Sequence, residues 1–170
     1  MVVRVLRAVL VTGYLIALVL LTGAAVGFAA RQGWLVPVGL ILPVLPIVGL
    51  RWLRAKEQLA GWSLFTVWLG STYLPIGTPP EVAVFLVILG AAFVGYRYRS
   101  TQLLAMAWFA HIAWDVFPRD LPAVLADLPA ACMLFDGIVG VYLCASWRRL
   151  FDASAAEVFR RAGETVLRGS

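Results

Sequence analysis

Long apolar blocks, separated by short clusters of charge, dominate the pattern of this chain. Asp, Glu, Lys and Arg are absent from residues 8–30, 32–50, 58–80, 82–96 and 100–114, and residues 128–147 contain only Asp136. A membrane-spanning helix needs about 20 predominantly apolar residues. The pattern therefore predicts an all-α, polytopic integral membrane bundle with six transmembrane helices, at about residues 8–30, 33–50, 59–76, 79–96, 101–118 and 128–147.

The composition agrees with a lipid environment. Of the 170 residues, 62% are hydrophobic and only 14% are charged, whereas soluble domains carry about 25% charged residues. Such a chain has too little polar surface to cover itself in water. We expect one transmembrane domain over residues 1–147, with no separate soluble domain.

The net charge of +5 reflects topology rather than a nucleic-acid partner. Arg31 and Arg119 are the only basic residues in the loops of one predicted side. The other side carries the remaining twelve of the fourteen, namely Arg4, Arg7, Arg51, Arg54, Lys56, Arg97, Arg99, Arg148, Arg149, Arg160, Arg161 and Arg168. Because basic residues concentrate in cytoplasmic loops, we predict that both termini are cytoplasmic. The Arg-rich loops favour a bacterial inner (plasma) membrane.

The C-terminal segment, residues 148–170, has the pattern of a short amphipathic helix. Ser154 and Glu157 form a capping box, and apolar residues follow at helical spacing. Arginines on the other face would contact anionic headgroups. We therefore expect an interfacial helix on the cytoplasmic surface.

The second predicted span contains three prolines, Pro37, Pro43 and Pro46. Proline removes a backbone donor and kinks a helix, and a membrane helix tolerates this where neighbours or a cavity satisfy the freed carbonyls. We expect a curved packing helix here in preference to a broken helix beside a pocket.

The candidate site consists of ionisable residues placed deep in the predicted spans. His111 and Asp115 lie one helical turn apart, about 5–6 Å along the axis. Asp136 lies near the middle of the next span, at the depth of His111, and sequential antiparallel helices usually pack together. Glu81, at the outer start of the fourth span, is a fourth candidate. Intramembrane ionisable residues are costly and commonly functional, so we predict that these four side chains are catalytic, in an outward-opening pocket. The alternatives are a structural His–Asp contact between helices and a helix-capping role for Glu81.

Four further residues are candidates for contact with a substrate. Trp68 and Trp108 fall deeper than the interfacial aromatic residues, Trp114 lies one residue before Asp115, and Cys132 lies one turn before Asp136. Aromatic faces can stabilise a carbocation. For Cys132, a role as a small packing residue is the favoured alternative.

Acid/base chemistry on a lipophilic substrate fits these residue types best. Buried carboxyl groups and a histidine can have pKa values that are driven apart, so that one donates a proton while another accepts one. Isomerisation, cyclisation or hydrolysis of an isoprenoid or lipid would suit such a pocket, by analogy with membrane sterol isomerases. A metal needs three or four ligands, and one histidine is few, so we expect no metal or other cofactor.

The stretch PPEVAVF, residues 79–85, resembles the Pro-x-Glu-Glu/Asp motif of membrane lycopene cyclases and their relatives. In that motif the acid protonates an olefin. The resemblance implies that Glu81 is an acid. The motif's second acid is replaced by Val82 here, and the similarity covers only these few residues.

Two other classes of function stay open. Intramembrane His and Asp residues also occur in proton relays, so a small proton-coupled transporter or channel, formed as a homo-oligomer, is one alternative. A non-catalytic subunit of a larger membrane complex is the other.

Overall fold

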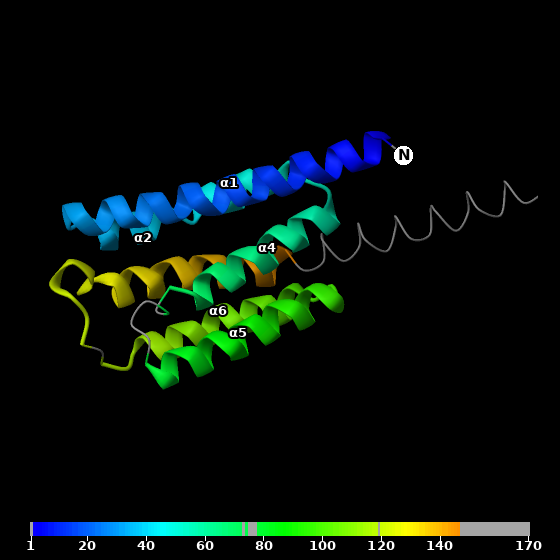
Figure 1. Ribbon diagram of the computed structural model, residues 1–170. Helices are drawn as coiled ribbons and strands as arrows, with labels where there is room; N and C mark the ends of the chain where they lie inside the picture. The colour runs from blue at the N-terminus through cyan, green and yellow to red at the C-terminus, as the bar shows by residue number, and fades with distance from the viewer. Residues whose placement is uncertain (1, 73, 75–77, 119, 147–170) are drawn as a thin grey trace, which may run out of the picture.

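A computed structural model describes residues 2–72, 74, 78–118 and 120–146. It is 85% helical, and the described residues contain no strand. Figure 1 shows the helices lying side by side along one general direction. They are α1 Val2–Gln32, α2 Leu35–Ile41, α3 Val44–Arg51, α4 Ala55–Gly70, α5 Pro79–Arg97, α6 Thr101–Asp115, the short 3₁₀ helix η2 Ala123–Leu125, and a last helix over residues 128–146. The predicted amphipathic tail, residues 148–170, lies outside the described residues.

Among the described residues, three helical segments are long and apolar enough to cross a membrane: Val2–Gln32, Pro79–Arg97 and Ala123–Ser146. They coincide with the first, fourth and sixth predicted spans. The other three spans also correspond to helices, but α4 has 16 residues, α6 has 15, and the apolar segment Leu35–Arg51 is likewise shorter. Six membrane crossings therefore stay a prediction, while an all-helical fold is confirmed.

The proline-rich second span bends between α2 and α3. The interruption falls at Leu42 and Pro43, where both residues keep right-handed helical dihedral angles. The Leu42 amide still donates to the Val38 carbonyl at 2.7 Å. The segment is thus kinked by proline rather than separated into independent pieces.

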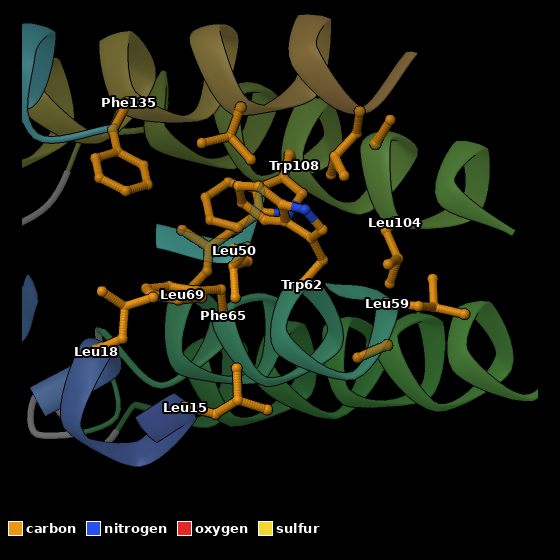
Figure 2. Close-up of a cluster of buried hydrophobic side chains, with 14 residues drawn as sticks. Leu15, Leu18, Leu50, Leu59, Trp62, Phe65, Leu69, Leu104, Trp108 and Phe135 are labelled. Carbon is orange, nitrogen blue, oxygen red and sulfur yellow. The ribbon is translucent and has the colours of Figure 1, made fainter. Parts of the chain in front are cut away.

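The core lies between α4, α6 and the 128–146 helix, with α1 and α3 closing one side. Trp62 and Phe65 of α4 are fully buried there, and Trp108 of α6 stacks on Phe135 with ring centroids 5.7 Å apart. Figure 2 shows these rings meeting leucine side chains from several helices, including Leu50. Aromatic packing therefore fixes how the helices that carry the candidate site sit against one another.

The molecule is apolar outside and contains its ionisable site inside. Leu20 and Leu21 of α1 and Leu86, Val87 and Phe93 of α5 are all exposed. Within the part of the chain that the structure describes, the buried polar side chains are those of Thr22, Gln58, Ser63, Thr66, Glu81, Thr101, His111, Asp115, Asp136 and Ser146. Exposed apolar faces of this extent mark a protein or membrane contact surface, which supports membrane association.

An ion pair ties the first helix to α4 at one end of the bundle. Arg7 donates from Nε and Nη2 to the two Glu57 carboxylate oxygens, at 2.9 and 2.8 Å. Glu57 also accepts from the backbone amide of Arg54 at 3.0 Å, at the start of α4. The hydrogen bonds from Arg7 hold the pKa of the Glu57 carboxyl below its usual value. This bidentate contact fixes α1 against the N-terminus of α4.

Candidate functional site

A histidine and two aspartates meet in the interior of the bundle. His111 Nδ1 lies 2.8 Å from Asp136 Oδ2 and 3.2 Å from Asp115 Oδ2. His111 is 1% exposed, Asp115 4% and Asp136 0%. The sequence predicted that His111 and Asp136 lie at the same depth on neighbouring helices, and the structure places them in direct contact.

The turn between α5 and α6 helps set the position of His111. Ser100 caps α6 by accepting a hydrogen bond from the Leu103 amide at 3.2 Å. Arg99, at φ 53°, takes the left-handed conformation that reverses the chain within a few residues, and the Ser100 amide donates to the Gly95 carbonyl at 2.8 Å. From this fixed start, three turns of helix carry His111 into the core.

Close approach of α6 to the 128–146 helix brings the two sides of the site together. A Cβ atom added at Gly140 would lie 2.7 Å from the ring of Phe109. Gly140, one turn after Asp136 along the helix, therefore leaves space for this ring. Glycine at this position thus lets the Phe109 ring of α6 pack closely on the helix that carries Asp136.

The electrostatics of the cluster favour a proton or another cation between the carboxylates. Burying two ionised carboxylates together is expensive unless positive charge compensates them. Asp115 is the last residue of α6, and His111 lies one turn before it. The cluster can therefore store protons and pass them between three closely spaced groups.

A partly open cavity of about 40 Å³ adjoins Asp136 on the side away from α6. It lies between α1, α2, the end of α4 and the start of the 128–146 helix. Most of its lining is apolar, with Leu35, Val38 and Phe135 among the residues that form it. Asp136 also lines it, and its second oxygen, Oδ1, is buried without a hydrogen-bond partner among the described residues. Asp136 thus joins the His111 cluster to an apolar cavity.

The predicted substrate-contact residues separate into two groups. Trp68 and Cys132 both line the cavity. Trp108 lies in the packed core, where its indole Nε1 donates to Thr66 Oγ1 at 3.1 Å, and it does not line this cavity. Trp114 donates from Nε1 to Glu81 Oε2 at 3.0 Å.

Glu81 is buried in the first turn of α5, as a candidate acid would be. The group of ligand-type side chains found among the described residues comprises His111, Asp115 and Asp136, without Glu81. Acidic residues in the first turn of a helix also interact favourably with its dipole. A catalytic role for Glu81 therefore stays a prediction.

The three clustered residues also have the chemistry of a metal-ligand set. One ligand atom from each of His111, Asp115 and Asp136 lies within 4.8 Å of the others. An imidazole nitrogen and two carboxylate oxygens would neutralise a divalent cation. The expectation of a site without a metal stays a prediction.

Two features of the site were not predicted from the sequence. The cavity wall formed by α2 includes Gly39, where an added Cβ would lie 2.5 Å from the Ala131 carbonyl oxygen. The hydrogen bond from Trp108 to Thr66 joins α6 to α4 one turn before His111. The prolines near Gly39 were the signal for a pocket beside the second span, but nothing in the sequence paired Thr66 with Trp108.

Comparisons with protein-family models, with curated proteins and with solved structures found no match for this chain.

Proposed function

We propose that this protein is a membrane-embedded enzyme that performs acid/base chemistry on a lipophilic molecule, by isomerisation, cyclisation or hydrolysis. Asp136 exchanges a proton with the substrate at the cavity, and His111 and Asp115 supply and store that proton. An isoprenoid or another lipid is the substrate class that suits the apolar lining.

One observation carries this proposal: the two oxygens of Asp136 have different surroundings. Oδ2 lies 2.8 Å from His111 Nδ1. Oδ1 is buried and has no hydrogen-bond partner among the described residues, and the Asp136 side chain lines the cavity. A buried carboxylate oxygen without a hydrogen bond is costly. A contact that served only to hold the helices together would not need a cavity beside it, whereas a general acid or base needs a reactant within reach.

Charge balance suggests how the cluster works. With a neutral imidazole and two ionised carboxylates its charge is −2, so two added protons make it neutral. An imidazolium, one carboxylate and one protonated carboxyl satisfy this condition. Such a cluster can give one proton to one atom of the substrate through Asp136 and take a different proton from another atom of the same molecule. An isomerisation or a cyclisation requires these two transfers.

The cavity is suited to the reacting end of a molecule rather than to a whole lipid. About 10–15 Å³ is needed to hold one water molecule, so a cavity of about 40 Å³ accepts a short stretch of chain. The rest of the lipid would lie among the exposed apolar faces of the helices. Trp68, in the cavity wall, offers an aromatic face to positive charge that develops on the substrate.

The membrane arrangement is part of the same proposal. We infer six crossings with both termini in the cytoplasm, in a bacterial inner membrane. Three helices of sufficient length and apolarity support it, as does the concentration of arginine at alternate loops. In this arrangement the cavity lies toward the outer end, since α1 and α4 both end beside it.

Lipid extraction and mass spectrometry of the purified protein test this proposal. Wild type should retain a lipophilic molecule, and Asp136→Asn and His111→Ala should change its amount or its identity. Asp127→Asn is the matched control, because Asp127 is exposed and precedes the same helix. If no lipophilic molecule co-purifies, or if all four proteins yield the same extract, the proposal fails.

A further inference from the structure

A second cavity, of about 290 Å³, lies at the end of α4 remote from the His111 cluster. It is bordered by the first turn of α4, the last turn of α5 and the first residue of α6. Three of its lining residues are cationic: Lys56, Arg97 and Arg99. None of the described residues that line it carries a carboxylate, although the Arg7–Glu57 ion pair lies at the same end of α4.

The backbone adds to the positive potential of this cavity. Both α4 and α6 begin at its wall, with Ala55 and Thr101, and helix N-termini carry partial positive charge. Lys56, in the first turn of α4, adds a full positive charge where the helix dipole disfavours one. An anion in the cavity would be attracted by the side chains and by both helix ends at once.

The depth of this cavity matches the headgroup region of a bilayer. α5 is one of the three candidate spans and ends at Arg97. Tyr98, 73% exposed, and Trp52, 86% exposed, lie at the same end of the bundle. Exposed aromatic residues of this kind concentrate at membrane–water interfaces. This placement depends on α5 crossing the membrane and not on the proposed chemistry of the His111 site.

We propose that this cavity binds a phosphate group, supplied either by an anionic lipid headgroup or by a soluble phosphate ester. Arginine matches phosphate oxygens with paired donors, and lysine binds phosphate as a point charge. Tyr96 and Thr101 also line the cavity, and their hydroxyl groups can act as further donors. Basic pockets between helices on the cytoplasmic side of a membrane recognise phosphate headgroups in this way.

Binding measurements on the purified protein in a neutral detergent test this inference and separate the two sources. The probes are a short-chain phosphatidylglycerol, a short-chain phosphatidylcholine and inorganic phosphate. Tighter binding of phosphatidylglycerol than of the other two assigns the site to an anionic lipid. Binding of inorganic phosphate with equal affinity assigns it to a soluble phosphate.

Charge-removing variants show whether the binding occurs in this cavity. Lys56→Gln and Arg97→Gln should each weaken binding about fivefold, as expected for one basic side chain near a headgroup. Arg99→Asn should do the same, because asparagine tolerates the positive φ of this position. Arg51→Gln is the matched control, since Arg51 is an exposed cation at the end of α3 that does not line the cavity.

Circular dichroism and a thermal unfolding curve of each variant check that the fold is retained. The inference is overturned if neither anionic probe binds. It is also overturned if the lining variants bind as wild type does, or if Arg51→Gln loses as much affinity as they do.

Discussion

Replacing Thr66 by valine should destabilise the bundle by taking away the partner of a buried indole. Trp108 Nε1 donates to Thr66 Oγ1 at 3.1 Å, and both side chains are fully buried. Valine keeps nearly the shape of threonine but has no hydroxyl, so the indole N–H would remain without an acceptor. The hydrogen bond lies one turn before His111 and joins α6 to α4.

The expected loss follows from the cost of an orphaned donor. Leaving a buried polar group unsatisfied costs about 1–3 kcal/mol. In membranes the measured contribution of such bonds is smaller, often about 0.6 kcal/mol, because separated helices also find partners. We therefore expect the free energy of unfolding to fall by about 1–2 kcal/mol.

Thr22→Val is a control that the chain itself provides. Thr22 is equally buried and donates to the carbonyl four residues earlier, Leu18 O, as Thr66 donates to Trp62 O. No side-chain donor to Thr22 is found among the described residues. Thr22→Val should therefore lower the free energy of unfolding much less than Thr66→Val does.

Unfolding in mixed micelles, followed by circular dichroism, gives the two free energies. In a Trp108→Phe background, Thr66→Val should hardly change the free energy of unfolding, because the indole donor is then absent. Equal losses for the two valine variants, or an undiminished loss in the Trp108→Phe background, would refute the assigned hydrogen bond.

Three further predictions concern other parts of the molecule. Gly39→Ala should lower the free energy of unfolding by about 1–3 kcal/mol through overpacking, because the new Cβ would meet the Ala131 backbone. Gly90→Ala, which has open space around it, should leave the free energy of unfolding unchanged. Unfolding curves of the two variants measure the difference. Glu57 has a lowered pKa, so the stabilisation from its pair with Arg7 is complete above about pH 4.3 and is lost as the pH falls through the lowered value. Between neutral and acidic pH, the free energy of unfolding of wild type should therefore fall more than that of Glu57→Gln. Equal falls would show that the ionised Glu57–Arg7 pair does not stabilise the fold. Cys132→Phe should fill the cavity and displace the co-purified lipophile, as measured by mass spectrometry, while Cys144→Phe, on an exposed position, should not.

The helices and the meeting of His111 with Asp136 could be predicted because both depend on simple periodicities. Uncharged blocks show where helices form, and equal depth on consecutive antiparallel helices brings two residues together. The contact between His111 and Asp115 follows from their i, i+4 spacing alone. These relations need no knowledge of side-chain packing.

The cavity and the roles of the tryptophans could not be predicted in this way. Depth alone does not tell which way a side chain faces, so Trp68 and Trp108 were indistinguishable in the sequence. The structure places Trp68 in the cavity wall and Trp108 in the core, stacked on Phe135. The cavity also needs the contact of Gly39 with the Ala131 backbone, which joins helices far apart in the chain.

Isotope transfer from water would show whether Asp136 exchanges protons with a lipophilic molecule in the cavity. Membranes containing wild type, Asp136→Asn or Asp127→Asn would be incubated in water enriched in deuterium and ¹⁸O. Their lipid extracts would then be compared by mass spectrometry. An isomerase or a cyclase places deuterium on carbon, and a hydrolase places ¹⁸O in its product. We expect label in one lipophilic species with wild type and Asp127→Asn, and none with Asp136→Asn. Equal labelling in all three membranes, or none in any, would show that Asp136 does not exchange protons with such a molecule.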